Sequence, residues 1–103
     1  MANVQAIHWS NAATVNINVS SSSQAVALGN TGRGYTQMDI MNDGTATVWV
    51  NFGDSTVTAS LSTGKPIGAG ANVVCTVGSG ETYAAAIAAG STGKIYFTPG
   101  SGL

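Results

Sequence analysis

Charged side chains are scarce in this 103-residue chain. Lys and Arg together number 3 and Asp and Glu number 4, so 7% of the residues are charged, against about 25% in ordinary globular proteins. Three scattered basic residues cannot neutralise a nucleic-acid backbone or hold the chain on an anionic membrane surface. We therefore expect neither nucleic acid nor membrane among the partners, and a surface made mainly of neutral polar residues.

Cysteine, histidine and long apolar runs are also scarce. Cys75 and His8 are single residues of their kind, so we expect neither a disulfide framework nor a zinc site. Cys75 alternates with Val73 and Val77, which predicts a buried small side chain. No run is long and apolar enough to span a bilayer. Residues 1–5 show neither the positive charge nor the apolar segment of a signal peptide, so we expect synthesis in the cytoplasm.

The sequence carries no signature of catalysis. A hydrolase needs a nucleophile, a base and an orienting group, yet His8 stands alone and no Gly-x-Ser-x-Gly motif is present. The glycine-rich stretch 29–34 lacks the spacing of a phosphate-binding loop. Asp39, Asn42 and Asp43 offer oxygen atoms to calcium, but their spacing fits a turn better than an EF-hand. We predict a protein that is not an enzyme and that uses no cofactor or metal.

What the sequence does have is alternation of apolar and polar residues with a period of two, which is typical of half-buried strands. The clearest stretch runs from Asn42 to Asp54, with turn-forming residues at both ends. Between the turns, Val48, Val50 and Phe52 share one face. We expect the first turn to use residues that tolerate a positive φ, and Asp54 to accept a local hydrogen bond. Similar patterns predict strands over 14–20, 24–28, 35–42, 57–61, 72–77 and 94–98.

Two segments are harder to assign. The alanines of 82–90 favour a helix, but its length allows only about two turns, which is marginal without strong packing. We favour a strand there, with Ile87 facing the core. Residues 62–70 read as a long connection, in which Pro66 argues against an interior strand position.

These patterns predict an all-β fold with roughly seven to nine short strands, arranged as an antiparallel β-sandwich of which the jelly roll is one form. We expect one sandwich domain over residues 13–103 and an N-terminal arm over residues 1–12, which either forms an edge strand or docks on a neighbour. The side chains predicted to face inward are Val15, Ile17, Val19, Val26, Leu28, Met38, Ile40, Val48, Val50, Phe52, Val73, Val77, Ile87, Ile95 and Phe97.

Outward-facing aromatic side chains are the candidate contact residues. Trp49 alternates with the core residues of its strand, and Tyr96 lies between two core positions. A ring buries a large area at a small cost in conformational entropy, so outward aromatic residues commonly make contacts. We select Trp9, Trp49, Tyr96 and Tyr35 as protein-contact residues. Trp49 meets either another molecule or this chain's own arm near Trp9.

Four segments in the last two thirds of the chain carry a resemblance to a known class of protein. They are residues 41–54 (MNDGTATVWVNFGD), 66–70 (PIGAG), 83–90 (YAAAIAAG) and 95–102 (IYFTPGSG). In this succession, residues 35–103 resemble small structural proteins of tailed bacteriophages. The resemblance implies a capsid decoration, or cement, protein: a β-sandwich or jelly roll that binds the major capsid protein lattice on the virion surface. It also implies a homo-oligomer, often a trimer.

Two other functions stay open. A carbohydrate-binding or host-recognition module would stack the same aromatic residues on sugar rings. A sugar site usually adds polar groups close to the ring, and only Asn51 evidently shares a face with Trp49. A minor tail or head-completion protein would differ from a decoration protein in its copy number.

Overall fold

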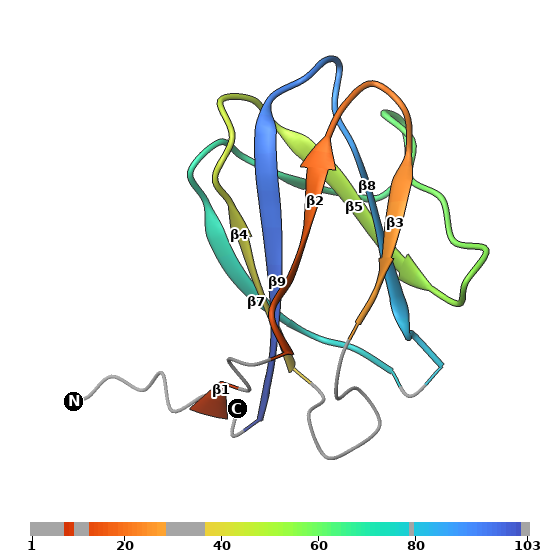
Figure 1. The fold of residues 1–103 in the computed structure, drawn as a ribbon, viewed down its shortest axis with the longest axis vertical. Coiled ribbons are helices and arrows are strands. Elements are labelled where there is room, and N and C mark those ends of the chain that lie inside the picture. The colour runs from red at the N-terminus through yellow and green to blue at the C-terminus, as the bar shows by residue number, and fades with distance from the viewer. Residues whose placement is uncertain (1–7, 10–12, 29–36, 79, 102–103) are drawn as a thin grey trace.

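The computed structural model describes residues 8–9, 13–28, 37–78 and 80–101, and the all-β prediction is confirmed (Figure 1). Within these ranges there is no helix long and apolar enough to cross a membrane. The described strands are β1 (His8–Trp9), β2 (Val15–Val19), β3 (Gln24–Ala27), β4 (Gln37–Asn42), β5 (Val48–Gly53), β6 (Lys65–Ile67), β7 (Asn72–Thr76), β8 (Tyr83–Ile87) and β9 (Gly93–Ser101).

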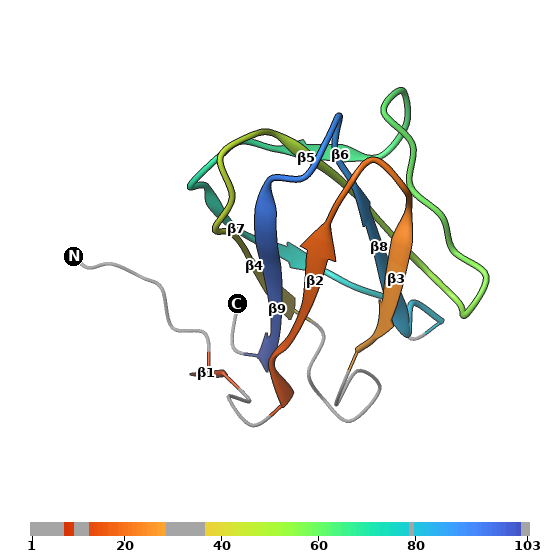
Figure 2. The ribbon, with the colours of Figure 1, turned by 45° about the horizontal axis from the view of Figure 1, so that its top comes forward.

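The strands form two antiparallel sheets that pack face to face as a sandwich (Figures 1 and 2). One sheet has the order β2-β9-β4-β7, with β1 pairing on the end of β9, and the other has the order β3-β8-β5-β6. The pairs nest within one another: β2 with β9, β3 with β8, β4 with β7, and β5 with β6. This is the connectivity of a jelly roll, so the predicted sandwich takes that form.

The core lies between the sheets and contains nearly all of the predicted inward side chains. Phe97 and Phe52 meet edge to face, with ring centroids 6.0 Å apart, which is a favoured aromatic geometry. The buried core cluster consists of Ile17, Val19, Leu28, Met38, Ile40, Val48, Val50, Ile67, Val77, Ala84, Ala86, Ala88, Ile95 and Phe97, with Val15, Val26, Phe52, Ala71, Val73 and Cys75 packed against it.

The segment 82–90 contains strand β8, as predicted, but its inward face was predicted incorrectly. Ala84 and Ala86 face the core, and Ile87 faces outward. The register with β5 is the cause, because it places Ala86 opposite the buried Val50 and Ile87 opposite Trp49, and residues directly opposite share a face. The small alanine side chains leave room in the core for the large residues of the facing sheet.

The strand predicted over 57–61 is wrong. These residues belong to a connection, joined only by an isolated bridge from Ser60 to Thr63. Local polar contacts replace strand pairing: the Asp54 carboxylate accepts from the N–H of Thr56 at 2.9 Å, and Ala59 N donates to Ser23 Oγ at 2.9 Å. Residues 54–64 therefore form a connection between β5 and β6 and add no strand to the sheet that contains β3.

A buried asparagine joins the turn after β4 to the connection after β6. Asn42 is 0% exposed, and its Nδ2 donates to the carbonyl oxygens of Ala46, Ile67 and Gly68 at 3.0, 2.9 and 3.1 Å. Its Oδ1 accepts from Gly44 N at 2.9 Å. One side chain therefore holds two connections together at this end of the sandwich.

The glycine in that turn has a different role from the one predicted. The described glycines with a positive φ are Gly64, Gly70 and Gly93, and Gly44 is not among them. A Cβ on Gly44 would lie 2.6 Å from Thr92 Oγ1. The Thr92 hydroxyl accepts from the N–H groups of Thr45 and Ala46 at 2.8 Å each. Gly44 thus permits a close approach of two loops.

Candidate contact surfaces

Trp9 is the most exposed of the predicted aromatic contact residues that the structure describes, with 49% of its surface accessible. It lies on β1, where His8 pairs with Ser101 and Trp9 pairs with Gly100. β1 and β2 lie along the same side of β9, because β9 pairs with β4 on its other side. The described part of the predicted arm is therefore an edge strand.

Trp49 and Tyr96 lie half-buried on opposite outer faces of the sandwich. Trp49 is on β5, and its sequence neighbours in that strand, Val48 and Val50, are buried in the core. Tyr96 is on β9 of the other sheet, again between two buried neighbours. Both point outward as predicted, but the structure does not bring them together. Tyr35 lies outside the described residues.

The residues directly opposite Trp49 are Pro66 on β6 and Ile87 on β8. Opposite residues of an antiparallel sheet share a face, so the indole lies in an apolar row across three strands. Trp9 pairs with the end of β9 in the other sheet and does not belong to this row. Of the two alternatives for Trp49, cover by the chain's own arm near Trp9 therefore receives no support from the described residues of the arm, His8 and Trp9, which join the five-stranded sheet.

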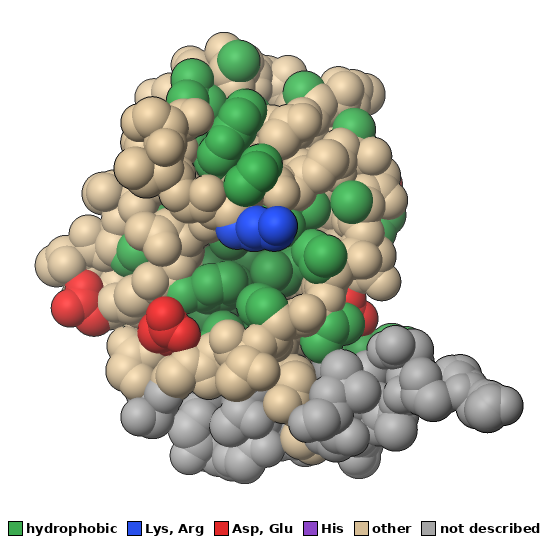
Figure 3. All heavy atoms as spheres, turned by 180° about the vertical axis from the view of Figure 1, so that it is seen from behind, with side chains coloured by type: hydrophobic (Ala, Val, Ile, Leu, Met, Phe, Trp, Pro, Cys, Tyr) green, Lys and Arg blue, Asp and Glu red, His purple; other side chains and the backbone are tan. Residues whose placement is uncertain are grey.

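An apolar groove opens between the two sheets along the edges formed by β6 and β7. Its volume is about 570 Å³. In Figure 3 hydrophobic side chains gather in a hollow on this side of the molecule, with a basic side chain across it. The apolar residues of the lining are Ile40, Val50, Phe52, Ile67, Val73, Val74 and Cys75.

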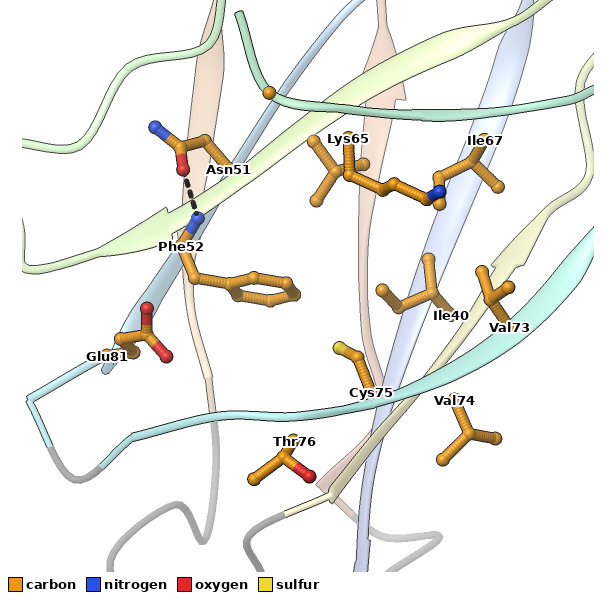
Figure 4. Close-up of a pocket in the computed structure, with 12 residues that line it drawn as sticks. Ile40, Asn51, Phe52, Lys65, Ile67, Val73, Val74, Cys75, Thr76 and Glu81 are labelled. Carbon is orange, nitrogen blue, oxygen red and sulfur yellow. Dashed lines mark hydrogen bonds between the residues drawn. The ribbon is translucent and has the colours of Figure 1, made fainter.

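The groove has one charged residue toward each end. Figure 4 shows Lys65 extending beside Ile67 and Glu81 lying at the opposite end, beyond Phe52. Glu81 Oε1 accepts from Gly78 N at 2.7 Å, which holds the carboxylate at the end of β7. Among the described residues, no acidic group forms an ion pair with Lys65.

Cys75 lines the same groove and is half-buried. Burial raises the pKa of its thiol, and the negative charge of Glu81 raises it further. Both causes disfavour the reactive thiolate. The prediction of a small side chain in an apolar setting is confirmed in part, because Cys75 packs against the core but remains accessible from the groove.

Two of the three residues considered as calcium ligands, Asp39 and Asn42, have other hydrogen-bond partners. Asp39 accepts a hydrogen bond from the side-chain amide of Asn72, and the Asn42 side chain is occupied by backbone groups. Over the described ranges, no three His, Cys, Asp or Glu side chains are grouped so that they could hold a metal ion.

The groove was not predicted from the sequence, because one of its walls comes from β6. Residues 62–70 read as a connection, yet Ile67 pairs with Val48 and is 2% exposed. Pro66 occupies an edge strand, where proline is tolerated. The isolated apolar residue after Pro66 was the available signal, and a run of three residues is too short for an alternation pattern.

Comparisons with known proteins add a likeness of fold. No protein-family model matches the chain, and no curated protein matches its sequence. A chain from the solved structure described as "Bacillus endospore appendages form a novel family of disulfide-linked pili" is similar with a TM-score of 0.50 and 17% identity, over 100% of this chain and 95% of that chain. At this identity the likeness concerns the fold alone.

Proposed function

We propose that this chain is a non-enzymatic structural protein that decorates a bacteriophage head by binding the major capsid protein lattice on the virion surface. The resemblance of residues 35–103 to small phage structural proteins supplies the class of particle. The observation that carries the proposal is the position of Trp9, a large ring 49% exposed on a strand anchored to β9.

A half-exposed indole on a paired strand is suited to binding a surface. Covering its accessible part would remove on the order of 100 Å² of apolar area from water and contribute about 2.5 kcal/mol. Pairing with β9 restricts the backbone in advance, which reduces the entropy lost on binding. Many equivalent lattice sites would let such modest contacts stabilise a whole shell.

The scarcity of charge gives the contact a second property. The exposed side chains of β2 include Asn16 and Asn18, and the whole chain has a net charge of −1. Binding that depends on apolar and neutral polar contacts is screened little by salt. We therefore expect attachment to the particle to persist at 1 M NaCl.

The test is rebinding of purified protein to particles from which it has been removed. We expect the wild type to rebind and to raise the temperature at which the particles lose their genome. Trp9→Ala should lower the affinity between about tenfold and a hundredfold, as the loss of about 2 kcal/mol implies. Leu61→Ala is the matched control, because Leu61 is 48% exposed but lies in the connection between β5 and β6.

Equal loss of binding in both variants, or no loss in Trp9→Ala, would contradict the role of Trp9. Absence of the protein from purified particles would contradict the function itself. A head-completion or tail protein would be present in few copies.

The carbohydrate-binding alternative has less support from the geometry. Trp49 and Tyr96 lie on opposite outer faces, and Trp9 lies at the edge next to β9, so these three rings do not form one stacking platform. A glycan array with bound sugars, together with loss of that binding in Trp49→Ala, would favour the alternative.

A further inference from the structure

The outer edge of β7 is less protected than that of β6, the neighbouring edge strand of the other sheet. Natural sheet edges are blunted by charge, proline, bulges or short length. β6 has 3 residues, Lys65–Ile67, and includes both a lysine and a proline. β7 has 5 residues, Asn72–Thr76, none of them charged or proline, and it pairs only with β4 among the described strands. A further strand can therefore pair with this edge.

The backbone of β7 presents hydrogen-bonding groups to that edge. Alternate residues of an antiparallel strand direct their N–H and C=O groups to the same side. Ala71 O accepts from Asn42 N at 3.0 Å, so the backbone N–H and C=O groups of the odd-numbered residues of β7 point toward β4. The backbone groups of the even-numbered residues Asn72, Val74 and Thr76 then point toward the open edge.

The apolar groove lies directly beside this edge. Val73 and Cys75 point into it from β7, and Phe52 points into it from the other sheet (Figure 4). An added strand would bring its own inward side chains over the groove. Backbone pairing and apolar burial are thus available along the same line of residues.

We propose that β7 pairs antiparallel with β7 of a second copy of this chain, about a two-fold axis at Val74, so that the two apolar grooves cover one another. Such a contact is isologous, which is the commonest form of interface between identical subunits. The inference goes beyond the proposed function, because that function requires no contact between copies, and the pairing does not depend on binding to a particle.

The charges favour a second copy as the occupant. Lys65 lies toward the Val73 end of the groove, and Glu81 follows the Thr76 end of β7. Antiparallel pairing reverses the direction of the partner, which brings Lys65 near the partner's Glu81 and, by symmetry, Glu81 near the partner's Lys65. An uncharged peptide or an apolar small molecule would fill the groove without pairing either charge.

The contact is also compatible with the surface proposed for the particle. β7 and β1 lie at opposite edges of the five-stranded sheet, so one copy can bind a neighbour through β7 while Trp9 remains accessible. Two-fold pairing yields a dimer by itself and a hexamer if it joins two trimers. Even-numbered assemblies are therefore the expected products.

The experiment is a charge exchange followed by analytical ultracentrifugation of the full chain over a wide range of concentrations. Lys65→Glu and Glu81→Lys each place like charges together twice in every dimer, and each should weaken pairing about tenfold. The double variant restores opposite charges and should recover the wild-type affinity. Recovery would distinguish this two-fold contact from general damage to the fold.

Three further variants keep the result interpretable. Lys94→Glu is the matched control, because Lys94 is exposed on β9 and does not line the groove; it should pair as the wild type does. Glu81→Gln removes the charge but keeps an acceptor for Gly78 N, and should weaken pairing less than Glu81→Lys. Val74→Lys places two lysines at the proposed axis and should leave monomers that unfold cooperatively.

Several results would overturn the proposal. A wild type that stays monomeric at millimolar concentration would show that another molecule, or none, occupies the groove. Assemblies that are odd-numbered, or that survive Val74→Lys unchanged, would place the contact elsewhere. A double charge variant no better than the single variants would contradict the antiparallel arrangement. Variants that lose pairing but still bind particles would show that pairing and the role of Trp9 are independent. Failure of the wild type to bind particles would contradict the proposed function without affecting the pairing.

Discussion

Replacement of Asn42 by alanine tests whether one buried side chain holds two connections of the jelly roll together. The amide has two hydrogens, which three carbonyl oxygens share at 2.9 to 3.1 Å, and Oδ1 accepts a further bond from Gly44 N. The variant therefore loses the equivalent of about three hydrogen bonds, each contributing about 1 kcal/mol net. Only the bond to Ile67 O is fully buried, so water can replace part of the others.

We expect Asn42→Ala to lower the free energy of unfolding by about 2 to 3 kcal/mol, which is a large fraction of the roughly 5 to 15 kcal/mol of a typical domain. The midpoint of thermal unfolding should fall by roughly 10 to 20 °C. Urea unfolding followed by circular dichroism measures the change. Asn18→Ala is the control, since Asn18 is exposed on β2, and it should stay within about 0.5 kcal/mol of the wild type.

Asn42→Asp sharpens the test, because it keeps the shape and reverses the hydrogen-bonding character. At neutral pH a carboxylate would face three carbonyl oxygens, so this variant should be less stable than Asn42→Ala. Burial among acceptors raises the pKa of such a carboxyl, and stability should increase as the pH falls and the group becomes protonated. A loss below about 1 kcal/mol in both variants would refute this account of Asn42.

Three further predictions concern a loop, a carboxylate and the thiol. Gly93→Ala should lower the free energy of unfolding in urea by about 2 to 3 kcal/mol, because φ is +133° and a Cβ would lie 2.9 Å from the backbone of the facing turn. Gly90→Ala is the control and should change stability little, because the space around Gly90 is open. Equal effects of the two substitutions would contradict the explanation. Hydrogen bonds from Thr56 lower the pKa of Asp54 below its ordinary value of 3.8, so the contribution of Asp54 to stability is present above that pH and is lost as the pH falls through the lowered pKa. Asp54→Ala should therefore reduce the loss of stability that the wild type shows at acidic pH. An unchanged loss would contradict this role of Asp54. Cys75 should react with a thiol reagent at pH 8 more slowly in the folded protein than in urea, and equal rates would show that burial does not suppress the thiolate.

Much of the fold could be predicted because alternation carries the information. In β2, β4, β5 and β9 buried apolar side chains alternate with residues that are mostly more exposed, so a period of two indicates both the strand and its inward residues. The turn at Asp54 was predictable for a similar reason, since an aspartate followed by polar residues can satisfy nearby N–H groups through its own side chain.

The errors occur where tertiary structure decides between local alternatives. Residues 57–61 alternate as a strand would, but the connection that contains them forms its own polar contacts and contact with Ser23. In β8 both faces contain alanine, so the sequence could not fix which face is inward, and pairing with β5 decided it. A glycine is needed at position 44 because Thr92 lies against it, and Thr92 is far away in sequence.

Some features of the candidate contact surfaces could be predicted from the sequence, and others depend on how the strands are assembled. The outward direction of Trp49 and Tyr96 follows from parity within one strand, which is local information. That they lie on opposite faces depends on the assignment of β5 and β9 to different sheets. The groove requires β6 and β7 to meet at one side of the sandwich, and neither strand indicates this by itself.

The central claim, that this chain is a structural component of a phage shell, is tested most directly by its copy number in purified virions. Quantitative staining or mass spectrometry against the major capsid protein gives that number. A decoration protein should be present in hundreds of copies, in a fixed ratio to the shell lattice. Absence from the virion, or a few copies per particle, would contradict the claim.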